Sequence, residues 1–277
     1  MIQRGLLGLC SLILLFSCAT TAQDIKVKGN RDPSTEITIV KPFRTLEVDG
    51  DFEVKIVPGA QPQVEMITDS NLHEHIDFNV VGEKLTINST ARIRSKRKME
   101  IRITYNTELH TIILREDAEL STITKGEFSI LDIKVQDDAK AYITANVQQL
   151  ILHTTGDSKS EFNLTGDKAD INITDNADVK ALITYQSANI TLKDRVDARI
   201  EGDVDKGNLI LNDKAFLEAK NLVYDEINLN ITDNAKVEVN ANKTLNIESD
   251  KDADISIYNS PDIKLIKFGG DSIIRKK

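Results

Sequence analysis

The stretch INITDNADV, residues 171–179, returns almost unchanged as LNITDNAKV at residues 229–237. Each copy has apolar residues in alternation, a short turn containing Asp and Asn, a small residue, and then alternation again. Alternation with a period of two is typical of β-strands that bury one face. The stretch therefore predicts a strand, a tight corner and a second strand.

Further copies of this unit follow one another from residue 109 almost to the end of the chain. The copies recur about every 19 residues. This period is too short for an independently folding unit but suits one coil of a β-solenoid, in which each coil depends on its neighbours. The sequence thus predicts an all-β solenoid in which each coil holds two strands and two corners. The small residues that align the copies are Ala118, Ala139, Ser158, Ala177, Val196, Ala215, Ala235 and Ala253.

Alternation also predicts which side chains fill the core. In one coil the inward residues are Ile171, Ile173, Ala177, Val179, Ala181 and Ile183, and in the next they are Ile190, Leu192, Val196, Ala198 and Ile200.

Aspartate recurs at the predicted corners, in two positions relative to the small residue. We expect the chain to bend at these residues and their carboxylates to accept backbone N–H bonds in Asx turns. Calcium in this column is the alternative, but the paired-glycine calcium repeat is absent. Asp175, Asp194, Asp213 and Asp233 lie two residues before the small residue, and Asp117, Asp138, Asp157 and Asp252 lie one residue before it.

The rest of the chain divides around this repeat. Residues 1–22 resemble a signal peptide, 23–40 a linker with a first strand, and 41–108 a hairpin-rich first rung that caps the solenoid, which extends over residues 109–268. Residues 269–277 are expected to form a basic tail. The uncharged stretch from Leu6 to Phe16 is too short to span a bilayer as a helix. Cleavage after Ala22 is favoured over a lipid anchor on Cys18, so we expect an exported protein in the periplasm, on the outer membrane surface or secreted.

The composition narrows the possible functions. With 44 acidic and 35 basic residues the formal net charge is −9, which argues against nucleic-acid binding. Five cations nevertheless crowd into seven residues of a predicted hairpin tip: Arg92, Arg94, Lys96, Arg97 and Lys98. The plain interpretation is a solvated tip that discourages edge-to-edge strand pairing. The alternative is docking onto an anionic lipid or polysaccharide surface.

The opening stretch of the cap, FRTLEVDGDFEVKIVPG at residues 43–59, followed by Leu72, Leu85, Ile87, Leu109 and Ile112, resembles the putative auto-transporter adhesin, head GIN domain family. The resemblance implies an exported right-handed parallel β-helix of two sheets, without catalytic residues and with adhesion as a proposed role. The family's Gly-Ser-Gly corners are mostly replaced here by Asp-Asn-Ala and related turns.

The motifs of common enzymes give no competing prediction. The sequence has no nucleophile elbow, phosphate-binding glycine loop or paired-cysteine metal motif. His73 and His75 could face one metal ion, but no third ligand is recognisable and a solvated connection is the simpler interpretation. We therefore expect no cofactor and a non-catalytic envelope or surface protein that binds an envelope or extracellular glycan or protein. A polysaccharide lyase or hydrolase and a purely structural periplasmic module are the alternatives.

Overall fold

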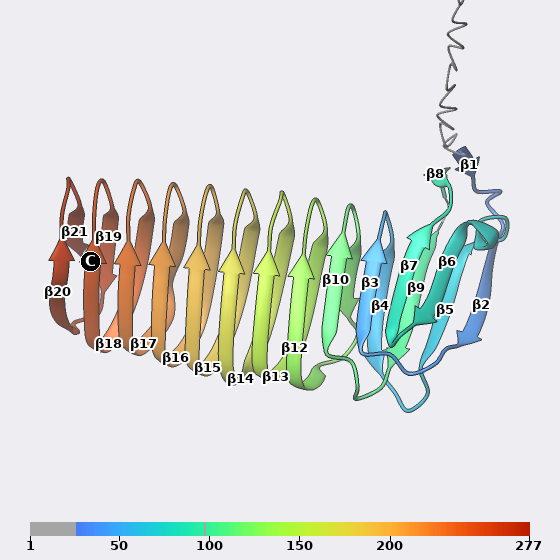
Figure 1. Ribbon diagram of the computed structural model, residues 1–277, viewed down its shortest axis with the longest axis horizontal. Coiled ribbons are helices and arrows are strands. Elements are labelled where there is room, and N and C mark those ends of the chain that lie inside the picture. The colour runs from blue at the N-terminus through green and yellow to red at the C-terminus, as the bar shows by residue number, and fades with distance from the viewer. Residues whose placement is uncertain (1–25, 97) are drawn as a thin grey trace, which may run out of the picture.

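The computed structural model describes residues 26–96 and 98–277, and strands dominate it. From Thr111 to Lys276 the chain winds as a right-handed coil of parallel strands, which forms most of one elongated solenoid (Figure 1). The described segment contains no helix long and apolar enough to cross a membrane. The strands of the solenoid are β10 (Thr111–Arg115), β11 (Glu119–Thr122), β12 (Gly126–Val135), β13 (Lys140–Thr154), β14 (Lys159–Ile173), β15 (Asp178–Leu192), β16 (Asp197–Leu211), β17 (Phe216–Ile231), β18 (Lys236–Ser249), β19 (Asp254–Tyr258), β20 (Asp262–Phe268) and β21 (Ile273–Lys276).

Each long strand contributes to both sheets because it bends at its middle. In β15 the residues on either side of Gln186 pair with β16, while Gln186 itself has no partner across the bend. At the start of the solenoid the two halves are separate short strands. The first half corresponds to β11, which pairs with the first half of β13, and the second half corresponds to β10, which pairs with the second half of β12. One rung is therefore a strand, a lower corner, a second strand and an upper corner.

Neighbouring rungs stack in parallel and in register, so that residues of the same kind lie next to each other in successive rungs. Ile171 lies beside Ile190, and Ile190 beside Leu209. The eleven side chains predicted to face inward in two successive coils are all buried, with at most 9% of any one exposed. The eight small residues used to align the copies are also buried. The sequence predictions of the solenoid and of its inward face are confirmed.

Residues before the repeats build the N-terminal end. Its elements are β1 (Lys26–Lys28), β2 (Pro33–Ile39), β3 (Thr45–Asp49), β4 (Glu53–Pro58), β5 (Gln63–Asp69), the short 3-10 helix η1 (His73–His75), β6 (Ile76–Val81), β7 (Lys84–Ser89), β8 (Arg92–Ser95) and β9 (Met99–Tyr105).

Two short antiparallel layers extend the solenoid's sheets at this end. β2 pairs with β5 and β5 with β9, while β6 pairs with β7. In turn β9 and β7 pair in parallel with β4 and β3, which lead into the regular rungs. Antiparallel strands therefore lie outermost at the end where residues 41–108 were expected to form a cap (Figure 1).

Two boundaries differ from the expectations. Residues 23–40 were expected to hold a linker with one strand, but two strands lie there, because β1 pairs with β8 and β2 with β5. The expected basic tail from residue 269 contains β21, which pairs with β19 and completes a further rung. Both segments are short, and each forms strands by pairing with partners distant in the sequence. The expected signal peptide, residues 1–22 with Cys18 and Ala22, lies outside the described residues.

Candidate functional site

The upper corners form a column along the solenoid, and one residue in each corner has a positive φ. Aspartate and glycine tolerate this left-handed conformation better than most residues, which explains their recurrence. The column runs through Glu116, Asp137, Gly156, Asp175, Asp194, Asp213, Asp233, Lys251 and Gly270.

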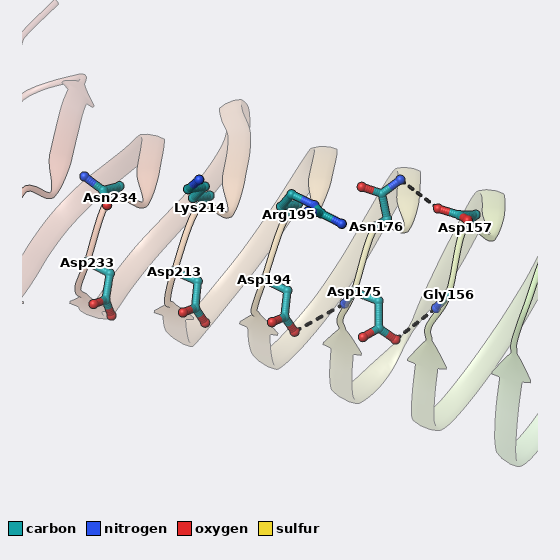
Figure 2. Close-up of a pocket in the computed structure, with 10 residues that line it drawn as sticks. All are labelled: Gly156, Asp157, Asp175, Asn176, Asp194, Arg195, Asp213, Lys214, Asp233 and Asn234. Atoms are coloured by element: carbon teal, nitrogen blue, oxygen red, sulfur yellow. Dashed lines mark hydrogen bonds between the residues drawn. The ribbon is translucent and has the colours of Figure 1, made fainter.

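Three of the corner carboxylates accept a backbone N–H of the preceding rung. The Gly156 N–H donates to Asp175 Oδ2 at 3.0 Å, and the Asp175 N–H donates to Asp194 Oδ2 at 3.4 Å (Figure 2). The Glu116 N–H likewise donates to Asp137 Oδ2. Asp175 and Asp194 lie at the bend and accept backbone N–H bonds, as expected, but the expected Asx turn is wrong for them, because each donor belongs to the corner of the preceding rung.

The other set of aspartates belongs to the next position of the corner. Asp157 and Asn176 lie side by side at the tips of successive corners, and the Asn176 amide donates to Asp157 Oδ1 at 2.7 Å. These tip residues form a column beside a groove of about 610 Å³ that runs along the corners. The column continues with Arg195, Lys214 and Asn234. Asp117, Asp138 and Asp252 hold the same place in their own corners.

These corners are poorly suited to hold a metal ion. Cations and amides interrupt the acidic tip column, and the Lys251 ammonium already donates a hydrogen bond to the Asp233 carboxylate. Within residues 26–96 and 98–277, no three His, Cys, Asp or Glu side chains are grouped as metal ligands. The corner column thus acts chiefly as a ladder between rungs.

A second groove, of about 740 Å³, lies on the side of the solenoid and is lined mainly by asparagines and apolar residues instead of charged corner residues. Its floor is a ladder of asparagines on the outer face of the second strand halves. Asn189 donates to Asp170 at 2.6 Å, Asn208 to Asn189 at 2.7 Å, Asn228 to Asn208 at 2.9 Å and Asn246 to Asn228 at 2.8 Å. Beside the ladder the lining includes Thr191, Ile210, Asn230, Glu248, Lys264 and Ile266.

Sequence reasoning missed this amide ladder, although its signal was present. The four asparagines recur once in each rung, at the same interval as the small residues that align the copies. They stand at outward positions, where asparagine was taken as ordinary solvated surface.

The basic stretch is a strand rather than an open hairpin tip. Arg92 and Arg94 lie in β8, which pairs in parallel with β1 and forms a two-stranded sheet separate from the main one. The Lys96 Nζ lies 2.8 Å from Asp51 Oδ2 and the Lys98 Nζ lies 3.4 Å from Glu100 Oε2, so these two cations are paired. Arg97 lies outside the described residues.

The two histidines do not face a common ligand. They flank Glu74 in η1, where the His73 ring packs with 7% of its side chain exposed and Nε2 lies 2.8 Å from Ser34 Oγ. The His75 ring lies near Glu74. The expected solvated connection is therefore wrong for His73, which is built into the contact between η1 and β2.

The comparisons with known proteins agree with this architecture. A putative adhesin from Parabacteroides merdae superposes with a TM-score of 0.66 at 16% identity over 91% of this chain and 99% of its own. A putative lipid binding protein and a putative adhesin, both from Parabacteroides distasonis, give TM-scores of 0.64 and 0.62 at 15% and 18% identity. Each match covers 91% of this chain, with 99% of the lipid binding protein and 100% of the adhesin. These likenesses show the fold, and no curated protein matches the sequence.

The family model described as putative auto-transporter adhesin, head GIN domain, matches residues 42–166 and 156–261. These two matches overlap at the first long rungs and together extend from the cap to β19. The chain therefore belongs to this family of adhesin-like proteins.

Proposed function

We propose that this protein is an exported, non-catalytic binding protein of adhesin type that holds an extended, hydroxyl-rich ligand, such as a surface glycan, along its asparagine ladder. The observation that carries the proposal is the ladder itself, a row of exposed amides fixed in one orientation over successive rungs.

The chemistry of the ladder suits a polymer of sugars. Each amide uses one N–H to reach the previous rung, which leaves its second N–H and a carbonyl lone pair for a ligand. Rungs repeat about every 4.8 Å, so the amides offer donors and acceptors at a constant spacing. Hydrogen bonding to a repeating ligand would thus add up from rung to rung without rearrangement of the protein.

The groove is poorly equipped for hydrolysis. Glycoside hydrolysis generally uses two carboxyl groups facing each other across the bond. Glu248 is the one acidic residue among the described side chains that line the groove. These facts favour binding over the lyase or hydrolase alternative.

The proposal predicts a position-dependent loss of binding. Ile210 lines the groove with 39% of its surface exposed, and Leu182 is 48% exposed on the outer face of the other sheet. Ile210→Glu puts an unpaired carboxylate against the ligand, and we expect at least roughly tenfold weaker binding to glycan arrays or cell-envelope fractions. Leu182→Glu adds the same charge and should bind like the unaltered protein.

Equal binding by the two variants would rule out the asparagine groove as the binding face. Release of sugar fragments by the unaltered protein would reject the non-catalytic assignment. Thermal unfolding of both variants separates a local loss of binding from a loss of folding.

The proposed export also predicts where the mature chain begins. If the precursor is cleaved after Ala22, the intact mass of the protein recovered from the producing cell corresponds to a chain that starts at Gln23 without lipid. Recovery of acylated Cys18 would replace this route by the lipoprotein route, and recovery of the chain with residues 1–22 attached would contradict export by cleavage.

A further inference from the structure

The N-terminal end carries a cationic surface that the sequence only partly revealed. β1 and β8 form a ribbon of their own beside the large sheet, near the point where the chain enters the fold (Figure 1). We propose that this basic ribbon, defined by Lys26, Lys28, Arg92 and Arg94, docks the protein onto an anionic lipid surface.

The pairing of the two strands gathers the four cations. Lys26 lies in register with Arg92 and Val27 with Ile93. Neighbouring residues in register point to the same face of a sheet, and alternate residues do so along each strand. Val27 and Ile93 are half-buried and pack against the core. The register shifts after Val27, so that Lys28 pairs with Ser95, and Lys26, Lys28, Arg92 and Arg94 are all exposed on this ribbon.

These cations lack the partners that most other basic residues have. Over residues 26–96 and 98–277, no carboxylate oxygen forms an ion pair with the side-chain nitrogens of the four ribbon residues, whereas Lys96 and Lys98 bind Asp51 and Glu100. The ribbon thus offers charge that the described part of the chain does not neutralise.

The charge distribution would orient the molecule on such a surface. Residues 109–277 contain 21 basic and 30 acidic residues, while residues 26–108 contain 13 of each. An anionic surface would repel the solenoid and attract the ribbon, so the rod would be held by its N-terminal end. The asparagine groove, which begins at β15, would remain free of the membrane.

The place of the ribbon at the N-terminal end of the rod favours a bilayer over a soluble polyanion, because the ribbon can meet a flat anionic surface without bringing the acidic solenoid against it. Lys26 follows Cys18 by eight residues, which span at most about 29 Å when fully extended. On the lipoprotein route, which is the alternative to cleavage after Ala22, an acylated Cys18 would hold the ribbon next to the headgroups, and a single lipid chain needs such a second, polybasic signal for stable anchoring. Cations near an anionic leaflet each contribute to binding. The proposal rests on the proposed export but not on a ligand in the asparagine groove.

The test uses residues 23–277, which contain every described residue, and sedimentation with vesicles of phosphatidylcholine alone or with phosphatidylglycerol added. We expect binding only to the anionic vesicles at about 0.1 M salt, and its loss at about 1 M salt, where the Debye length falls from about 10 Å to about 3 Å. The variant Lys26→Gln, Lys28→Gln, Arg92→Gln, Arg94→Gln should bind at least roughly tenfold more weakly.

A matched variant removes the same number of charges from the solenoid. Lys125→Gln, Lys159→Gln, Lys193→Gln, Lys236→Gln alters four exposed lysines for which the described structure shows no ion pair, and it should bind vesicles like the unaltered chain. Equal losses in the two variants would overturn the proposal, as would equal binding to neutral vesicles. Binding to a soluble acidic polysaccharide but not to anionic vesicles would reject the lipid assignment. Circular dichroism and thermal unfolding verify that each variant is folded. Vesicle sedimentation does not depend on glycan binding, so the lipid proposal can fail without failure of the proposed function.

Discussion

Deletion of Gln186–Val204 is expected to give a folded protein that is shorter by one rung. The cut joins Tyr185 to Asp205, and the register then places Leu209 and Leu211 where Ile190 and Leu192 stood. Each rung contacts mainly its two neighbours, so the remaining rungs keep their packing. Small-angle scattering should show a rod shortened by about 4.8 Å, with strand content per residue unchanged in circular dichroism.

Deletion of only ten residues, Gln186–Arg195, should have a much larger effect. Leu209 and Leu211 would then take the outward places of Arg199 and Glu201, and the corner residue Asp213, with its φ of 62°, would fall inside a strand. Because one register error reverses the faces of a strand, we expect the rungs beyond the cut to unfold. Proteolysis followed by mass spectrometry locates the unfolded part. Similar melting and protease resistance for the two deletions would contradict the register of the rungs.

Gly202→Ala is expected to be the most damaging single substitution of those considered. The Gly202 φ is +118°, a conformation that residues with a Cβ rarely adopt. An added Cβ would lie 1.9 Å from the backbone oxygen of Ile183 in the preceding rung, which cannot move without breaking the ladder. Strain and overlap together should cost at least about 3 kcal/mol of unfolding free energy. For a chain of this size that lowers Tm by at least roughly 6 °C.

Gly82→Ala serves as the matched control. Its φ of +54° is also positive, but nothing lies within 4 Å of the added Cβ. Strain alone should cost about 1 kcal/mol, so the melting temperature should fall much less than in Gly202→Ala. If calorimetry gives the same loss for both variants, close contact between rungs does not explain the glycine at position 202.

The amino-acid sequence by itself determined the features that repeat at short range. Alternation at residues 171–183 and 190–200 predicted the buried face, and the recurring small residue predicted the position of each corner. These predictions succeeded because a strand alternates its side chains whatever its neighbour is, and because a rung repeats the environment of the rung before it. Family resemblance supplied the handedness and the two-sheet arrangement, which alternation leaves open.

The tertiary structure alone decided which residues become partners across rungs and between distant segments. Asp175 has a local turn available, yet its carboxylate accepts the N–H of Gly156, because stacking brings that donor closer. Asn189 and Asn208 form a ladder only because their rungs are in register. Lys26 and Arg92 are far apart in the chain and lie in strands too short to show a period, so no local pattern could pair them. In each case the physical reason is the same: the position of a partner is set by how the rungs and the N-terminal strands pack, and sequence spacing does not contain it.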